Sequence, residues 1–111
     1  MEKKDLDILI GLELSIGRAL WGAVIPSLRK VVLRWKPGDK TAWILFYHDG
    51  EINDAIEDNY SCVHTEVDAD FLVDPRIDFE VIRCDYPNPI SIRQDEEYII
   101  YARKEPFVDP K

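Results

Sequence analysis

Apolar side chains over residues 5–22 recur every three or four positions, which indicates an amphipathic helix. The residues that share its broad apolar face are Leu6, Leu9, Ile10, Leu12, Ile16, Ala19 and Leu20. Asp5 is a suitable N-cap for this helix, and Gly22 is a suitable stop signal. Gly11 and Gly17 weaken such a helix by about 1 kcal/mol each relative to Ala. We expect these two glycines to mark close packing against a sheet.

Two strands follow the first helix, and the turn between them joins them into a β-hairpin. Apolar and polar positions alternate over residues 28–36 and again over residues 41–48. The tetrapeptide Pro37-Gly38-Asp39-Lys40 between them is a turn signal. The face expected to pack against helices holds Val31, Leu33, Ala42, Ile44 and Phe46. The opposite face then holds Val32, Trp43, Leu45 and Tyr47.

A second helix is predicted over residues 52–71. Its apolar residues recur at helical spacing, and they are Ile52, Ile56, Tyr60, Val63, Val67 and Phe71. Asn53 is a suitable N-cap at the start of this segment. Asp54 and Glu57 in the first turn suit the positive end of the helix dipole.

The rest of the chain predicts two more strands, over residues 78–85 and 97–103, joined by a loop with two prolines. The last strand is an almost continuous apolar run, which is typical of a strand that is central or covered on both faces. Residues 105–111 are expected to form a tail. The order α-β-β-α-β-β, with two antiparallel hairpins, predicts an α+β two-layer sandwich, in which an antiparallel four-stranded sheet packs against two helices.

Composition supports a single domain over residues 1–111. With 46% hydrophobic residues, a chain of this length buries roughly two-thirds of its unfolded surface and needs neither a metal nor a disulfide. Cys62 and Cys84 lack CxxC spacing, and the glycines form no phosphate loop, so we expect no metal site and no cofactor. Charges interrupt the apolar residues near the start, which fits neither a signal peptide nor a membrane span. We therefore expect a cytoplasmic protein, monomeric when free, with reduced thiols.

The charge of the chain narrows the class of partner. The formal net charge is −8, whereas nucleic acids and anionic membranes select basic surfaces, so we expect neither as the main partner. A basic partner fits this charge, and solubility alone explains it equally well. The charge is also asymmetric, with net +3 over residues 1–48 and net −11 over residues 49–111. Such asymmetry suits electrostatic steering of a partner.

Acidic residues concentrate on the second helix. Residues 49–70 contain no Lys or Arg, and their acidic residues are Asp49, Glu51, Asp54, Glu57, Asp58, Glu66, Asp68 and Asp70. Like charges three or four positions apart destabilise a helix by about 0.2–0.5 kcal/mol per pair, so helix stability alone favours interleaved lysines. One interpretation is a docking face for a basic protein, built from Asp54, Glu57, Asp58, Glu66 and Asp68. The other is a solubilising helix exterior.

Trp43 and Tyr47 mark a second candidate surface. If they lie on the hairpin face opposite the helices, with Val32 and Leu45, they form an exposed apolar group of the kind that marks a contact site. The alternatives are the reverse orientation of the strand or cover by the C-terminal tail. Alternation along the strand does not decide between them.

The sequence offers few candidates for catalysis. His48 and His64 are the only histidines, and no HExxH or GxSxG motif is present. We expect surface or strand-end histidines rather than a general base. One alternative function is a small enzyme or ligand-binding protein with a site between sheet and helices, which uses His48 and nearby carboxylates. Another is a structural subunit that self-associates through the hairpin.

Several short segments between residues 17 and 105 resemble one group of small bacterial proteins. The segment Gly17-Arg18-Ala19-Leu20-Trp21-Gly22-Ala23-Val24-Ile25-Pro26-Ser27-Leu28-Arg29 is similar to the group's "RALLGEV-P-LR" pattern. The further matching segments are Arg34-Trp35, Phe46-Tyr47-His48-Asp49-Gly50, Thr65-Glu66-Val67-Asp68-Ala69-Asp70-Phe71 and Tyr101-Ala102-Arg103-Lys104-Glu105. The resemblance covers most of the chain.

The group consists of immunity proteins of contact-dependent growth inhibition and related polymorphic toxin systems. The resemblance therefore implies a cytoplasmic antitoxin that binds and blocks the toxin domain of a sibling cell's effector. It implies no catalytic residues. Toxins of this type are often nucleases with basic clefts, so the implied partner is a basic toxin domain, for which an acidic inhibitor is electrostatically suited.

Overall fold

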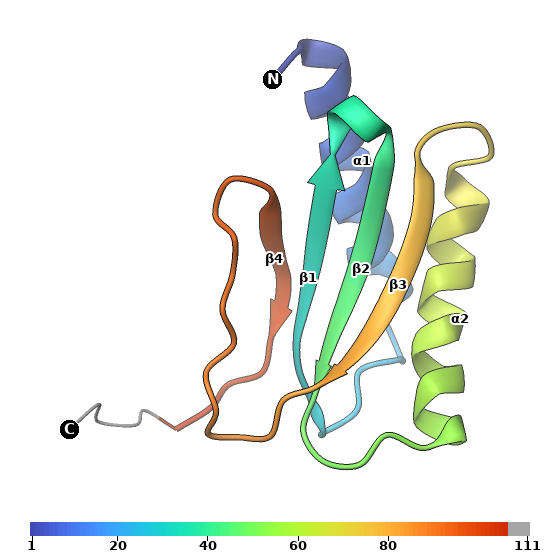
Figure 1. Cartoon of the computed structure of the whole chain (residues 1–111). Helices are drawn as coiled ribbons and strands as arrows, with labels where there is room; N and C mark the ends of the chain where they lie inside the picture. The colour runs from blue at the N-terminus through green and yellow to red at the C-terminus, as the bar shows by residue number, and fades with distance from the viewer. Residues whose placement is uncertain (107–111) are drawn as a thin grey trace.

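Two helices and four strands follow one another in the predicted order α-β-β-α-β-β in the computed structural model, which describes residues 1–106 (Figure 1). Their bounds are α1 Lys3–Ala19, β1 Leu28–Lys36, β2 Thr41–His48, α2 Asp54–Asp70, β3 Arg76–Arg83 and β4 Glu97–Ala102. A short 3-10 turn over Pro37–Asp39 closes the hairpin between β1 and β2. Both helices lie on one side of the sheet, so the α+β two-layer architecture is confirmed.

The sheet is mixed, and the prediction of an all-antiparallel sheet is wrong. The strand order is β3-β2-β1-β4. Strand β1 pairs antiparallel with β2 and with β4, whereas β2 and β3 are parallel. The physical reason is the crossover through α2, which returns the chain to the end of the sheet where β2 began. Because β3 and β4 occupy opposite edges, the second predicted hairpin does not form.

Strand β4 is an edge strand, which corrects the expectation that it is central. Ile99 is 52% exposed. The pairing with β1 shifts register between Val31 and Val32, so Tyr101 pairs with Val31 while Ile99 pairs with Val32. Such a bulge adds one residue to one strand. Tyr98, Ile100 and Tyr101 consequently all pack against the core, and the continuous apolar run reflects the bulge rather than cover on both faces.

Helix α1 buries a narrower face than its sequence pattern predicts. It begins at Lys3 after Glu2, three residues earlier than an Asp5 cap requires, and Glu2 makes no side-chain cap. Its core-facing residues are Leu9, Leu12, Ser15, Ile16 and Ala19. Leu6 and Ile10, which were expected on this face, are 45% and 47% exposed.

The two glycines of α1 do not pack against the sheet. A Cβ added at Gly11 lies 3.7 Å from the ring of Phe71, which follows α2. A Cβ added at Gly17 meets no atom within 4 Å. The expectation of close helix–sheet packing at these positions is therefore wrong. Gly11 faces the neighbouring helical segment, and Gly17 faces open space.

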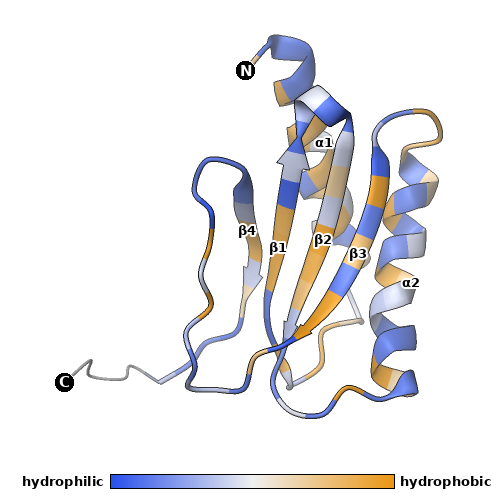
Figure 2. Cartoon of the chain, in the orientation of Figure 1, coloured by the Kyte–Doolittle hydropathy of each residue, from blue (hydrophilic) through white to orange (hydrophobic). Residues whose placement is uncertain are grey.

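Helix α2 follows its prediction closely. The Asn53 side chain accepts a hydrogen bond from the Ile56 backbone N–H at 2.9 Å, which confirms it as the N-cap. Tyr60, Val63 and Val67 are buried against the sheet. The Tyr60 ring stacks on Phe46 of β2 with ring centroids 4.6 Å apart. Figure 2 shows apolar residues concentrated along the middle of β1 and β2 and at the end of β3.

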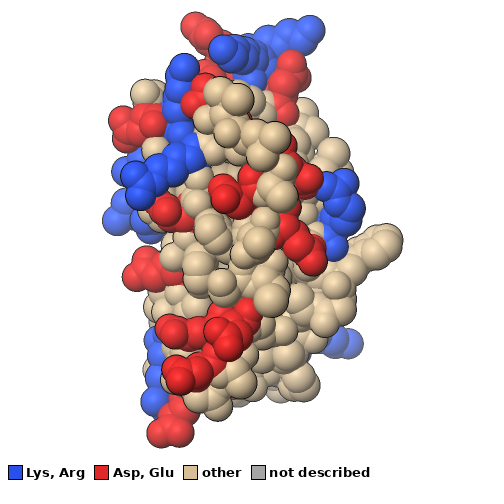
Figure 3. Space-filling model, turned by 90° about the vertical axis from the view of Figure 1, so that its right-hand side faces the viewer, with Lys and Arg blue, Asp and Glu red and all other residues tan. Residues whose placement is uncertain are grey.

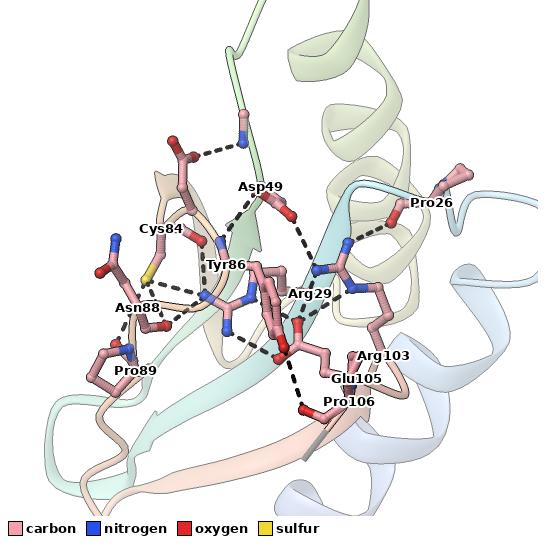
Figure 4. A network of polar contacts seen from close by, with 12 residues as sticks. Pro26, Arg29, Asp49, Cys84, Tyr86, Asn88, Pro89, Arg103, Glu105 and Pro106 are labelled. Carbon is pink, nitrogen blue, oxygen red and sulfur yellow. Dashed lines mark hydrogen bonds and ion pairs between the residues drawn. The ribbon is translucent and has the colours of Figure 1, made fainter. Parts of the chain in front are cut away.

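A polar network ties the loop after β3 and the end of the chain to β1 (Figure 4). Arg29 is 5% exposed and donates to both carboxylate oxygens of Glu105 and to the carbonyls of Cys84 and Asn88. Arg103 also pairs with Glu105, at 2.9 Å. These arginines hold the pKa of Glu105 down at about 2, mainly through the hydrogen bond from Arg29. Glu105, the first residue of the predicted tail, is thus held against β1 by these contacts. The tail residues 107–111 lie outside the described residues.

Candidate functional site

The outward face of α2 carries the five carboxylates expected to meet a partner. Asp54, Glu57, Asp58, Glu66 and Asp68 are all exposed. Among residues 1–106, none of them lies in an ion pair. Figure 3 looks onto this side of the molecule and shows acidic side chains across it, with Lys and Arg toward the top and the sides. Because no Lys or Arg of the described residues forms an ion pair with these carboxylates, their charge is exposed to solvent.

Two other acidic residues of the 49–70 segment serve the fold. The Asp70 carboxylate accepts from Ser15 Oγ at 2.6 Å and from Arg18 at 2.5 Å, which links α2 to α1. These contacts lower the pKa of Asp70, the Ser15 hydrogen bond more than Arg18. Asp49 pairs with Arg103 at 3.1 Å. The acidic segment therefore contains both internal ion-pair partners and free surface charge.

Trp43 and Tyr47 lie on the sheet face that points away from the helices. Trp43 pairs across the strands with Arg34 and Asp78, and Tyr47 pairs with Lys30 and Ile82. Both aromatic residues are half-buried. The Nζ atom of Lys36 lies 5.8 Å from the Trp43 ring centroid, within cation–π range.

This sheet face exposes less apolar surface than expected. Val32 and Leu45 have no exposed area, although neither belongs to the cluster that packs between sheet and helices. On this face Trp43 and Tyr47 flank Leu45 along β2, and Lys30 and Arg34 flank Val32 along β1. The apolar surface exposed on this face thus comes from the half-buried Trp43 and Tyr47 and from Ile99 of β4, which pairs with Val32 and is 52% exposed.

The structure does not bring the two predicted surfaces together. The α2 carboxylates lie on the outside of the helical layer, whereas Trp43 and Tyr47 lie on the outside of the sheet. One flat interface cannot bury both groups. A partner that uses both has to wrap around an edge of the molecule.

Both histidines make structural hydrogen bonds. His48 ends β2 as predicted, but it is buried rather than exposed, and its Nδ1 lies 2.8 Å from the Tyr60 hydroxyl. Burial lowers the pKa of His48, and burial raises the pKa of Tyr60 to about 12. The Nε2 atom of His64 contacts the carbonyl of Ile77 at 2.7 Å. The His48 ring is thus inaccessible from the surface, whereas His64 is half-buried on α2.

The structure contains a small cavity that neither histidine lines. It measures about 170 Å³ and is lined by Glu2, Lys4, Asp5, Ile8, Trp35, Lys40, Asp74 and Pro75. Within residues 1–106, no group of three or more His, Cys, Asp or Glu side chains is arranged to hold a metal. Cys62 and Cys84 are free thiols. None of the helices in this range is long and apolar enough to cross a membrane.

The solvent side of α1 is a surface that the sequence pattern missed. Ile10, Leu14 and Trp21 are 47%, 68% and 85% exposed. A shallow hollow beside them is lined by Glu13, Leu14, Gly17, Arg18 and Trp21. The signal was present as apolar residues at positions 10, 14 and 21. Ile10 was predicted on the core face, whereas Leu14 and Trp21 belonged to no predicted surface.

Comparison with known proteins gives one result that covers most of the chain. The model of the MafI2 immunity protein family matches residues 10–105. This range contains all four strands, α2 and most of α1. A comparison with curated proteins finds no match. Because the family match spans well over half of its residues, this chain belongs to the MafI2 immunity protein family, a family of small bacterial immunity proteins of polymorphic toxin systems.

Proposed function

We propose that this protein is a cytoplasmic antitoxin that binds and neutralises a cognate secreted toxin domain of a contact-dependent growth inhibition system. The observation that carries the proposal is the family match over residues 10–105. We further propose that inhibition is stoichiometric and needs no catalysis by this chain. Binding that covers the toxin's active site excludes its substrate.

The free carboxylates of α2 support a basic partner. A nuclease must bind phosphates, and Lys and Arg side chains supply that affinity. An acidic surface complementary to such a cleft raises the association rate, up to about 10⁸–10⁹ M⁻¹s⁻¹ at low salt. Asp54, Glu57, Asp58, Glu66 and Asp68 are exposed and unpaired within the described residues, so their charge is available for this role. We therefore propose a nuclease as the toxin.

The size of the molecule is compatible with this mode of action. A stable interface of standard size buries about 800 Å² on each partner. That is roughly a tenth of the 7131 Å² surface of this chain. One side of the helical layer is sufficient, and no large rearrangement is required.

The alternative function as a small enzyme depended on His48 as a general base, and His48 is buried. A general base has to reach a substrate proton at hydrogen-bond distance. His48 is 1% exposed and is engaged by Tyr60. Self-association through the hairpin has little apolar surface to use, because Val32 and Leu45 are already buried within the monomer.

The test is neutralisation of the toxin domain that is encoded beside this chain. Cells that express the toxin domain alone should stop growing, and co-expression of this protein should restore growth. The two proteins should also co-purify. A toxin domain encoded beside a different immunity protein is the matched control, and it should not be neutralised. Growth arrest that persists despite abundant folded protein would refute the proposal for that pair.

A further inference from the structure

Helix α1 is apolar on two opposite sides. Leu9, Leu12 and Ile16 face the sheet and are at most 5% exposed. Ile10 and Leu14 lie on the opposite side of the helix, and Trp21 continues their line two residues beyond its end. A helix that is apolar all round is normally buried on all sides. Here no other described segment covers the second side, which we call the α1 outer stripe.

The outer stripe contains a shallow hollow and, beside it, a projecting aromatic side chain. Gly17 lies at the hollow between Leu14 and Trp21, and a Cβ built on it meets nothing within 4 Å. Trp21 projects beside this hollow with 85% of its surface exposed. An aromatic projection beside an apolar hollow is the shape of an interface anchor, because Trp is enriched among residues that dominate binding energy.

Apolar surface also continues from the stripe toward β4. Glu13 borders the hollow at Gly17 and a second hollow lined by Ile90, Ile92, Gln94, Glu97, Tyr98 and Ile99. Ile99 is half-exposed there. The two hollows together join α1 to the free edge of the sheet. Exposed apolar residues rimmed by polar ones, as Glu13, Gln94 and Glu97 rim these hollows, are typical of interaction sites.

The acidic face of α2 lacks such anchors. Its exposed residues between Asp54 and Ala69 are small or polar, and they include no large apolar side chain. Exposed charges mainly change the association rate, whereas desolvated groups in the centre of an interface set the dissociation rate. The α2 carboxylates can therefore steer a partner but do not by themselves hold it.

The charges near the outer stripe favour a basic protein over a second copy of this chain as its partner. Asp70 pairs with Arg18, so the cation bordering the stripe is neutralised and α2 is fixed beside it. The rest of the helical layer is mainly acidic, because the unpaired α2 carboxylates lie beside α1, whose other charged residues are Lys3, Lys4, Asp5, Asp7 and Glu13. A second copy of this chain, with net charge −8, would bring two such sets together. A basic protein is attracted by the same charges.

We infer that the α1 outer stripe is the apolar anchor of the toxin interface, with Trp21 at its centre and the α2 carboxylates as its electrostatic flank. The inference rests on the proposed function and adds the location of the interface. It places the toxin on the helical layer and leaves the Trp43 and Tyr47 face of the sheet free.

The test measures the affinity of the neighbouring toxin domain for the wild type, for Trp21→Ala and Gly17→Gln, and for two comparison variants, Leu72→Ala and Trp43→Ala. Trp21→Ala should weaken binding by at least about 30-fold, as loss of a central Trp does. Gly17→Gln should also weaken it, because a long side chain fills the hollow while a helix-favouring residue replaces Gly. Leu72→Ala removes a side chain that is 89% exposed outside the stripe and should leave affinity unchanged. Circular dichroism confirms that each variant is folded.

The outcomes separate this inference from the proposed function. Binding by the wild type and undiminished binding by both Trp21→Ala and Gly17→Gln would overturn the location and keep the function. A loss confined to Trp43→Ala would place the toxin on the sheet face and would likewise overturn it. Dimerisation of the free wild type that Trp21→Ala abolishes would assign the stripe to a second copy. No binding by the wild type would refute the proposed function, and the inference with it.

Discussion

The Nδ1 atom of His48, at the end of β2, lies 2.8 Å from the hydroxyl of Tyr60 on α2. Both side chains are at most 1% exposed. When the neutral imidazole carries its proton on Nε2, Nδ1 accepts the hydrogen bond from the phenol. Protonation of His48 would remove the acceptor and bury a charge, which is why burial lowers its pKa.

Stability should therefore fall on mild acidification. The unfolded His48 binds a proton below about pH 6.5, whereas the folded side chain, with its lowered pKa, does not. Above that pH both states are neutral and the effect is absent. As pH drops below it, the unfolded state is stabilised until the folded pKa is reached. Urea midpoints between about pH 7.5 and pH 5 measure this loss, and a folded His48→Gln variant should show a smaller slope. An identical slope would contradict the assignment.

Glu105 should contribute in a separate and lower pH window. Its folded pKa of about 2 lies below the ordinary value of 4.5. The stabilisation by the ionised Glu105 carboxylate is thus complete at pH values above its ordinary pKa of 4.5, and it is lost as the pH falls toward 2. Glu105→Ala should cost about 3 kcal/mol, the low end for breaking a buried pair, because Glu105 is partly exposed while Arg29 is not. Asp78→Ala, which breaks an exposed pair with Arg76, should cost at most about 1 kcal/mol.

Two leucines on α1 test its two faces with the same chemical change. Leu12 is fully buried, whereas Leu14 is 68% exposed. Leu12→Ala should destabilise by roughly 2–5 kcal/mol, and Leu14→Ala should stay within about 0.5 kcal/mol of the wild type. Chemical unfolding of the two variants gives both values. Equal losses would show that α1 is rotated relative to this description.

Glycine substitutions should change stability in opposite directions. Gly17→Ala should stabilise by about 0.5–1 kcal/mol, because Ala favours the helix and its Cβ meets no atom. Gly22 has φ +79°, where a Cβ costs about 1–2 kcal/mol, so Gly22→Ala should destabilise. Thermal unfolding of both variants measures the difference. Destabilisation by Gly17→Ala would mean that the hollow at Gly17 is occupied in the free protein.

Local patterns predicted the local elements of the fold. The hairpin strands over residues 28–36 and 41–48, the turn between them and the Asn53 cap all depend on neighbours in the sequence, and all are found where expected. The choice of a pairing partner for β3 and for β4 depends on residues far apart along the chain. Two strands joined by a loop can pair with each other or occupy opposite edges, and neither alternation nor turn residues distinguish these outcomes.

The candidate site was predictable to a similar extent. Helical spacing places the α2 carboxylates opposite Val63 and Val67, and the structure has them exposed. The outer stripe escaped prediction because α1 is apolar on two sides, so spacing alone cannot say which side packs against the sheet. The burial of Val32 and Leu45 also escaped it, since alternation along a strand places a side chain on a face but does not give its exposure.

The most direct test of the account is the affinity of this protein for the toxin domain encoded beside it, measured at about 50 mM and about 300 mM salt. The comparison variant replaces Asp54, Asp58 and Asp68 by Asn and Glu57 and Glu66 by Gln, with circular dichroism as the folding control. The account predicts tight binding by the wild type that weakens with salt. It predicts weaker binding by the folded variant, with a smaller salt dependence. Absence of wild-type binding at both salt concentrations would contradict it.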